Sequence, residues 1–219
     1  AKQLREFAEA NDLPVGCAFR FQDTLDNNHP NFAGDVGIGI NPKLFARIKN
    51  ADVVLTIGAR LGEMTTSGYT LFEVPTPKQT MIHVHGDANE LGRVYQAELM
   101  IAAGVAEFAA AIADVKLGAA KAASRQAALA EVQADLAAWR GLPPLYKNRA
   151  TPAKLNLWEV VQTMRRLAPK DSIVTNGAGN FATWAHRFWP YAGIEHCVKS
   201  QLAPTSGAMG YGVPAAVMA

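Results

Sequence analysis

Hydrophobic and polar residues follow two different periods along the first half of the chain. A continuous, largely β-branched run at residues 51–58 is typical of a strand that is buried on both faces, and residues 80–85 predict another strand. Asn41 is a suitable N-cap for a helix with Pro42 in its first turn. The pattern also predicts helices over 1–11, 43–50 and 105–115 and strands over 14–19 and 99–103. Such alternation predicts an α/β fold, a doubly wound parallel sheet with helices on both faces, at residues 1–117.

The second half begins with a different pattern. Residues 118–141 are rich in Ala, Gln, Glu and Lys and predict a partly exposed helix that ends at Gly141. We therefore expect a helical linker over 118–153 and an incomplete second α/β unit over 154–219. This unit should contain a helix over 154–167, a strand over 171–175, a turn over 176–180 and a helix over 181–188. The apolar face of its first helix comprises Leu155, Leu157, Val160, Val161, Met164 and Leu167.

The last stretch, residues 205–219, is a glycine-punctuated turn that leads into a helix of small apolar residues. A helix without a polar face requires burial on all sides. The three glycines around Met209 and Tyr211 predict that the backbone closely approaches a ligand or another backbone segment. Because the sequence stops within this element, we expect the chain to be part of a longer protein.

Composition and charge exclude several classes of function. The chain has 219 residues, of which 49% are hydrophobic and 18% charged, and its net charge is +2. This balance gives no basis for binding nucleic acid or an acidic membrane surface, and neither a signal peptide nor a membrane-spanning run is evident. Cys17 and Cys197 are far apart and form no disulfide or zinc pattern, so we expect a cytoplasmic protein.

Two candidate binding positions follow the predicted strands of the first domain. Gly58 permits close approach of a ligand after residues 51–58, and Arg60 could bind a phosphate bidentately. A plain strand-to-helix turn explains these residues equally well. Asp87 could accept hydrogen bonds from a ribose, but we favour a helix N-cap, with Glu90 completing a capping box.

Other motifs are weaker indications of a binding or catalytic site. Residues 34–39 resemble a glycine-rich phosphate loop only superficially, because they do not directly follow a strong strand. The turn at 176–180 could hold a diphosphate on its free N–H groups, although a tight turn accounts for its glycines too. His83 and His85 share one face of a strand without a third ligand, so a structural role is favoured over a metal site. His186 and His196 have no catalytic partner at a suitable spacing.

The whole chain resembles the thiamine-diphosphate-dependent enzymes of the acetolactate synthase and pyruvate oxidase group. It covers their central domain and the start of their C-terminal, diphosphate-binding domain. The resemblance rests on four stretches in this order and spacing: residues 50–60, 82–92, 175–188 and 206–216.

The resemblance implies a fold of three α/β domains, assembled as a homodimer or homotetramer, and decarboxylation of a 2-oxo acid substrate, often with transfer of the two-carbon unit. It implies thiamine diphosphate and Mg²⁺ as cofactors. The residues it places at thiamine diphosphate are Gly177, Ala178, Gly179, Asn180 and Met209. The central domain of this family binds FAD or ADP in some members, and Gly58, Arg60 and Asp87 are the matching residues. His85 and Gly86, however, stand where flavin-binding relatives often carry an acidic and an aliphatic residue.

The sequence also departs from the family pattern. The family's activating glutamate belongs to an N-terminal domain outside these residues, and its Gly-Asp-Gly metal-binding segment would follow Ala219. We therefore assign no catalytic or metal-binding residue and expect these 219 residues alone to be inactive. The alternative is a non-catalytic nucleotide-binding or scaffold domain; a nicotinamide oxidoreductase is disfavoured. We expect residues 1–117 to fold alone, and the apolar elements of 150–219 to be disordered, proteolysed or buried in a partner.

Overall fold

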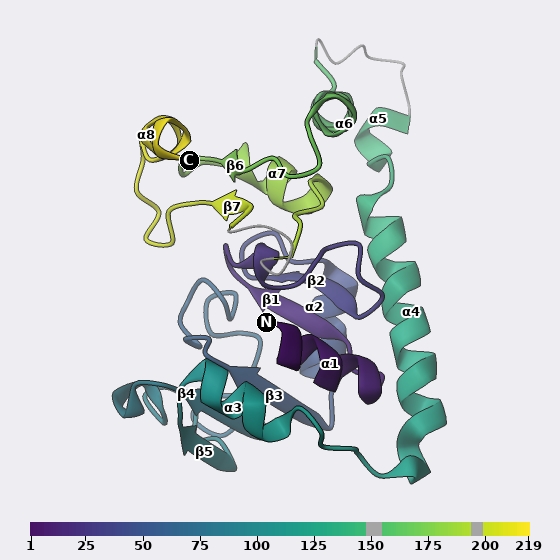
Figure 1. The fold of residues 1–219 in the computed structure, drawn as a ribbon, viewed down its shortest axis with the longest axis vertical. Coiled ribbons are helices and arrows are strands. Elements are labelled where there is room, and N and C mark those ends of the chain that lie inside the picture. Colours follow the sequence, from purple (N-terminus) through teal and green to yellow (C-terminus); the bar gives the residue numbers. More distant parts are fainter. Residues whose placement is uncertain (148–154, 194–198) are drawn as a thin grey trace.

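The computed structural model describes residues 1–147, 155–193 and 199–219 (Figure 1). The central domain contains α1 (Lys2–Ala10), β1 (Val15–Ala18), η1 (Gln22–Thr24), β2 (Phe32–Val36), α2 (Pro42–Lys49), β3 (Val53–Ile57), β4 (Thr80–His85), η2 (Ala88–Glu90), β5 (Leu99–Ala102) and α3 (Val105–Ile112). Beyond it lie η3 (Ala119–Lys121), α4 (Ala122–Arg140), α5 (Pro144–Lys147), α6 (Leu157–Leu167), β6 (Val174–Thr175), α7 (Ala182–Phe188), β7 (Gln201–Leu202) and α8 (Gly212–Met218).

Every strand pair among the described residues is parallel, which confirms the predicted α/β class. In the central domain the pairing forms two patches, β1–β2 and β3–β4–β5. Strand β4 lies between β3 and β5, with Leu55 opposite Ile82 and Ile82 opposite Leu99. Helix α3 packs on β4, and helices α2 and α4 pack on β2.

The prediction that residues 51–58 form a strand is confirmed, but the prediction that both faces are buried is wrong. Val53 is 56% exposed and the rest of β3 is only half-buried. The reason is topological: β3 is an edge strand of its patch, whereas Met81 and Val84 of the central strand β4 are completely buried.

The expectation that no strong strand adjoins residues 34–39 is wrong. Strand β2, Phe32–Val36, is buried at every position. Gly34 and the charged Asp35 interrupt its apolar pattern, which hides it in the sequence. Gly37, which follows, has a φ of 153°, and a Cβ there would lie 2.8 Å from the Phe19 Cβ. Close packing therefore explains this glycine.

Helix α2 begins as predicted. The Asn41 side chain accepts a hydrogen bond from the backbone N–H of Lys43 at 3.0 Å, and Pro42 occupies the first turn. Leu44 then faces the core of the central domain. The buried members of that core are Ala33, Val36, Leu44, Leu71, Phe72, Met81, Tyr95 and Val132.

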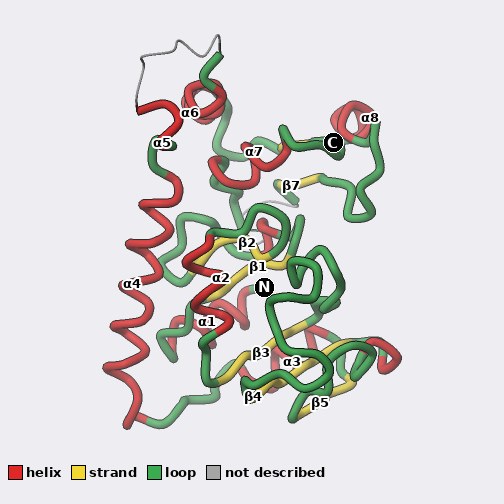
Figure 2. The backbone as a smooth tube through the Cα atoms, turned by 180° about the vertical axis from the view of Figure 1, so that it is seen from behind, coloured by secondary structure: helices red, strands yellow, loops and turns green. Residues whose placement is uncertain are grey.

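Helix α4 runs along the molecule beside both units (Figures 1 and 2). Most of it is exposed, as expected, but Val132 and Leu136 are buried against the central domain. The helix also contacts α7. It ends at Gly141, in agreement with the prediction. Residues 148–153 of the expected linker, and residue 154 of the second unit, lie outside the described residues.

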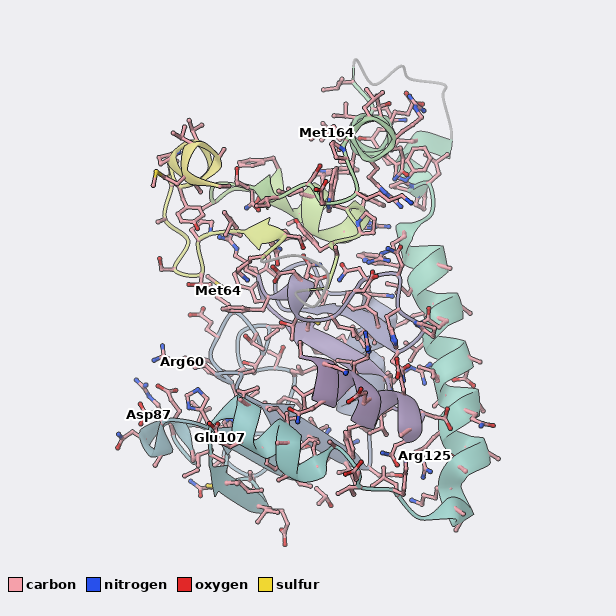
Figure 3. All side chains as sticks on the ribbon, viewed as in Figure 1. Arg60, Met64, Asp87, Glu107, Arg125 and Met164 are labelled. Atoms are coloured by element: carbon pink, nitrogen blue, oxygen red, sulfur yellow. The ribbon has the colours of Figure 1, made fainter. Side chains whose placement is uncertain are left out.

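The second unit is built on the two-stranded sheet β6–β7. Helix α6 begins at Leu157 because the Asn156 side chain accepts from the N–H groups of Trp158 and Glu159. The expected apolar face of α6 is mostly uncovered, because only Val161 of that set is buried. Its exposed members are Leu155, Val160, Met164 and Leu167, and Met164 projects from the helix in Figure 3.

The apolar helix at the end of the chain forms as α8, but nothing within these residues covers it: Val213, Val217 and Met218 are exposed. The expectation that the apolar elements of 150–219 are disordered, proteolysed or buried in a partner stays a prediction. The second unit has a small core of its own, whose buried members are Val161, Phe188, Trp189 and Tyr191.

The described residues contain no group of three or more His, Cys, Asp or Glu side chains that could hold a metal ion. Within the same residues, no helix has the length and apolarity needed to cross a membrane. Cys17 is buried with a free thiol, and burial raises its pKa to about 12. Cys197 and His196 lie outside the described residues.

Candidate functional site

A cleft of about 210 Å³ lies beside the carboxyl ends of β3 and β4. This is the edge of an open α/β sheet at which ligands bind. Its lining comes from the loop after β3, from β4 and from the segment around η2: Arg60, Leu61, Gly62, Tyr69, His83, Glu90, Arg93, Val94 and Tyr95. Arg60 is thus brought into the cleft, whereas Gly58 and Asp87 are not part of this lining.

Two arginines and one glutamate give the cleft its charge. The Glu90 carboxylate, which is only 11% exposed, accepts from Arg93 Nη1 at 2.9 Å and pairs with Arg60 Nη2 at 3.3 Å. Both guanidinium groups are well exposed, so each keeps donors for a further partner. Arginine binds phosphate oxygens through paired N–H donors, so this arrangement can hold a phosphate or diphosphate.

His83, on β4, lines the cleft with a buried ring. Burial lowers its pKa, so the imidazole is neutral at pH 7. Ring atom Nε2 lies 3.1 Å from the Ala59 carbonyl oxygen, which requires the tautomer with a proton on Nε2. The His83 and His85 ring centroids are 6.2 Å apart. The predicted structural role of His83 is confirmed: it ties the loop after β3 to β4.

Gly58 has a packing role that accounts for its identity. Its φ is +68°, in the left-handed region, and a Cβ at this position would lie 2.5 Å from Val105 Cγ2 in the first turn of α3. Its N–H donates to the Val84 carbonyl at 2.8 Å. The turn after β3 therefore requires glycine without any ligand. It leads into the loop before β4 and not into a helix, so the expected strand-to-helix turn is wrong. A cofactor role for Gly58 stays a prediction.

Asp87 is the N-cap of η2, as favoured from the sequence. Its Oδ1 accepts from the backbone N–H and the side-chain amide of Asn89, both at 2.9 Å, and these bonds lower its pKa. The expected capping box is wrong, because Glu90 turns into the cleft and the Asp87 N–H donates to His85 Nδ1 instead. Arg60 and Asp87 both lie at the same margin of the molecule (Figure 3).

The second candidate position is the turn at residues 176–180, after β6. A Cβ on Gly212 would lie 2.8 Å from the Gly177 nitrogen, and Thr175 Oγ1 donates to the Gly212 carbonyl at 2.9 Å. The two glycine-rich segments singled out in the sequence are therefore in backbone contact. Gly177, Ala178, Gly179 and Asn180 lie together in this turn, as expected.

The turn has the chemistry that a diphosphate requires. The backbone N–H groups of residues 177–181 have no backbone acceptor within the described parts of the chain. Successive N–H groups of this kind form a concave binding site for anions. The buried Asn176 Oδ1 also has no hydrogen-bond partner there. The residues present therefore fit one wall of a diphosphate site, and this fit rests on backbone groups.

Met209 lies in the loop that precedes α8, and its side chain is 86% exposed. The neighbouring Gly207 and Gly210 both have a φ of 77°, so the backbone bends sharply on either side of it. An exposed methionine between two such turns is available to a ligand or to another part of the protein. Its role at thiamine diphosphate stays a prediction.

Sequence reasoning missed several residues of the cleft. Tyr69, Arg93 and Tyr95 were not considered, and Glu90 was interpreted only as part of a cap. The Glu90–Arg93 spacing of three residues is a signal that could have been used, because i,i+3 pairs meet on one side of a helical turn. Tyr69 gives no such signal; it reaches the cleft through a left-handed backbone with a φ of 61°.

Comparison with known proteins adds two findings. The model of the family described as "Thiamine pyrophosphate enzyme, central domain" matches residues 1–112. The chain is 25% identical to the acetolactate synthase isozyme 3 large subunit of Escherichia coli (strain K12), over 99% of this chain and 36% of that protein. It is 26% identical to the sulfoacetaldehyde acetyltransferase of Roseovarius nubinhibens, over 97% of this chain and 37% of that protein.

A third relative is the probable chloroplastic acetolactate synthase 2 of Oryza sativa subsp. japonica, with 25% identity over 98% of this chain and 31% of that protein. The chain thus spans about a third of the length of the curated relatives it matches. These alignments continue through the second unit, beyond the residues that the family model covers.

Proposed function

We propose a function from one premise: this chain belongs to the thiamine pyrophosphate enzymes and contains their central domain. Within a polypeptide of its relatives' length, it acts as part of a thiamine-diphosphate-dependent 2-oxo acid decarboxylase or carboligase of the acetolactate synthase type. When bound, the cofactor supplies the carbanion chemistry that such a reaction needs. The residues of this chain bind and orient it.

The observation that supports this proposal most strongly is the contact between the turn at 176–180 and Gly212. It brings together Gly177 and Gly212, which are about 35 residues apart in the sequence, and leaves N–H groups of the turn without a backbone acceptor among the described residues. A scaffold domain has no need for such an arrangement. Gly177, Ala178, Gly179 and Asn180 would hold the diphosphate, and Met209 would contact the rest of the cofactor. Mg²⁺ would accompany the diphosphate, with ligands from outside these residues.

The 219 residues alone should not bind the cofactor tightly and should not catalyse. Isothermal titration with thiamine diphosphate and Mg²⁺ tests this on two samples, the 219-residue chain and the complete product of its coding frame. We expect metal-dependent binding and pyruvate decarboxylation only in the complete product. Tight metal-dependent binding by the 219-residue chain would contradict the inactivity, and absence of binding in both samples would contradict the cofactor assignment.

The cleft supports a second, non-catalytic function, the binding of ADP. Its volume of about 210 Å³ is smaller than the roughly 300–1,000 Å³ of pockets that enclose a drug-sized ligand. It accommodates the diphosphate of a nucleotide between Arg60 and Arg93 but does not enclose FAD. We therefore favour ADP over FAD at this position.

Titration of ADP into wild-type protein and an Arg93→Ala variant tests this second function. Arg93 is an exposed residue that pairs with Glu90 at the cleft rim. Its removal should therefore weaken ADP binding by about tenfold or more, as expected for one charge-assisted contact, without loss of folding. Lys43→Ala, which removes a surface cation on the far helix α2, is the control. Equal affinity of wild type and Arg93→Ala would refute the cleft as the nucleotide site.

Assembly and location complete the proposal. We propose a cytoplasmic homodimer or homotetramer that acts on a small 2-oxo acid and binds neither nucleic acid nor membranes. The net charge of +2 supports the absence of nucleic acid. The exposed apolar residues of α6 and α8 support association, because contiguous apolar patches mark interaction sites. Sedimentation of the complete coding-frame product would establish the assembly.

A further inference from the structure

A buried carboxylate joins the central domain to the second unit. Asp23, in η1, is 1% exposed. Its Oδ2 accepts from the backbone N–H of Ser200 at 3.1 Å and of Gln201 at 3.0 Å, and its Oδ1 accepts from Lys199 Nζ at 3.1 Å. Three donors from one short segment thus converge on one side chain that comes from about 177 residues earlier in the chain.

A second set of bonds lies beside it. The Gln22 N–H donates to Gln201 Oε1, and Gln201 Nε2 donates to Gln22 Oε1, both at 2.9 Å. Gln22 Nε2 donates to the His186 carbonyl at 2.7 Å, and the Asn27 N–H donates to the Tyr191 carbonyl at 2.9 Å. The side chains of Gln22 and Gln201 are fully buried, and each hydrogen bond described above for these side chains runs to the other unit. Separating the units would therefore break these bonds.

The segment held by Asp23 is β7, and β7 in turn holds the candidate diphosphate turn. The Val174 N–H donates to the Ser200 carbonyl at 2.8 Å, and the Asn176 N–H donates to the Leu202 carbonyl at 3.0 Å. Asn176 is the first residue of the turn at 176–180. Two hydrogen-bonded steps therefore connect the Asp23 carboxylate to the backbone that would face the diphosphate.

The second unit needs such a connection. An isolated two-stranded sheet is at best marginally stable in water, and β6–β7 has two residues in each strand. Hydrogen bonds to an ionised carboxylate are shorter and stronger than neutral ones, and buried donors that lose their acceptor are costly. Figure 1 shows β7 next to the β1–β2 end of the central domain, and η1 packs on β1.

We infer that Asp23 is a positioning residue for the turn at 176–180: through β7, the central domain fixes the backbone to which a diphosphate binds. This inference rests on the proposed function for the ligand, but the mechanical coupling does not depend on it. Asp23 does not touch the turn itself, so it acts through Ser200 and Gln201.

Hydrogen exchange of the 219-residue chain tests the coupling without any cofactor. Asp23→Asn replaces one carboxylate oxygen by an NH₂ group, which cannot accept from Lys199 or from the N–H groups of Ser200 and Gln201. The hydrogen bonds that fix β7 are therefore weakened. We expect the amides of Val174 and Asn176 to exchange about tenfold faster or more, the factor for one lost bond to a charged group, while β4 is unchanged. The matched control Asp135→Asn removes the ion pairs that Asp135 makes with Lys43 and Arg47, away from β7, and should leave both amides unchanged. Unaltered exchange in Asp23→Asn would overturn the inference.

A milder variant covers the case in which Asp23→Asn does not fold. Lys199→Met removes the half-exposed ammonium and leaves both backbone bonds to Asp23 in place. It should raise exchange at Val174 and Asn176 in the same direction but by a smaller factor. No rise in this variant would overturn the inference as well.

Cofactor titration of the complete coding-frame product supplies the second readout. Asp23→Asn should raise the dissociation constant of thiamine diphosphate about tenfold or more, and Asp135→Asn should leave it within about twofold. If wild type binds and Asp23→Asn binds equally well, Asp23 does not position the site. If wild type does not bind, the proposed function fails, and the exchange experiment still decides the coupling.

Discussion

Substituting alanine for Gly58 should destabilise the central domain by about 1–5 kcal/mol. Two costs add up at this position. A left-handed backbone costs a residue with a Cβ about 1–2 kcal/mol, and Gly58 has a φ of +68°. The new methyl group would lie 2.5 Å from Val105 Cγ2, and overpacking of this kind costs about 1–3 kcal/mol. The reduced entropy of the unfolded chain offsets about 0.4–1 kcal/mol.

Urea unfolding followed by far-ultraviolet circular dichroism measures this change. Tryptophan fluorescence does not suit the purpose, because all four tryptophans lie at residue 139 or later, outside the β3–β5 patch. Gly118→Ala is the matched control: its φ is −52°, and an added Cβ meets no atom within 4 Å. It should change the free energy of unfolding by less than about 0.5 kcal/mol.

A double-mutant cycle separates the two costs. Val105→Ala removes the methyl group that clashes, so adding it to Gly58→Ala should recover the packing cost and leave only about 1–2 kcal/mol for the backbone. A loss below about 0.5 kcal/mol in Gly58→Ala, or no coupling with Val105, would refute the packing argument. Gly58 would then be free for the role of close approach to a ligand.

The buried side chains of His186 and Asp35 should make opposite contributions to the pH dependence of the unfolding free energy. Burial lowers the His186 pKa to about 4 from the ordinary 6.5, so its contribution to stability is complete above pH 6.5 and is lost as pH falls towards 4. Burial raises the Asp35 pKa to about 7, so its contribution is present at pH 4 and lost as pH rises towards 7. His186→Phe should therefore leave a stability that falls between pH 4 and 7, and Asp35→Asn one that rises; identical slopes of the two variants, measured by urea unfolding, would contradict this. Asp87→Ala should destabilise η2 slightly, through loss of its cap, and leave ADP affinity unchanged; weaker binding in an ADP titration would instead support a ribose contact. Leu136→Ala should cost about 2–5 kcal/mol of unfolding free energy, because its side chain is buried in the core beside β2; a loss below about 1 kcal/mol would show that α4 is not held there.

Local signals in the sequence were sufficient to predict much of the secondary structure of the central domain. Residues 80–85 form β4 as predicted, and Asn41 caps α2 as predicted, because both features depend on neighbouring residues. Strand β2 was missed for the same reason. Its Gly34 and Asp35 indicate a loop locally, and only packing against Leu44 and Cys17 makes this segment a buried strand.

Burial could not be predicted in the second unit. The apolar spacing of α6 correctly predicts a helix, but whether Met164 or Leu167 is covered depends on how many neighbouring strands are present. The polar contacts between the units were equally hidden. Gln22, Asp23 and Gln201 are polar residues in unremarkable surroundings, and their pairing across about 178 residues has no local signal.

Of the two candidate sites, the sequence indicated the glycine-rich segments of the second unit but not the cleft of the central domain. The three glycines around Met209 and Tyr211 predicted a close approach to a ligand or to another backbone segment, and the structure places Gly212 against Gly177. The cleft could not be predicted without the tertiary structure, because Arg60 comes from one loop and Glu90 and Arg93 from another. These loops meet only when β3 pairs with β4.

Thiamine diphosphate affinity of a Gly177→Ala variant tests the central claim most directly. A Cβ on Gly177 would meet its nearest atoms, the nitrogens of Gly210 and Gly212, at 3.8 and 4.0 Å, so the fold tolerates it. If a diphosphate binds on the N–H groups of residues 177–181, a methyl group on Gly177 crowds it. In the complete coding-frame product we expect unchanged unfolding and an affinity about tenfold weaker or more, corresponding to one lost charge-assisted hydrogen bond. Wild-type affinity in this variant would contradict the assignment of the turn as the diphosphate site.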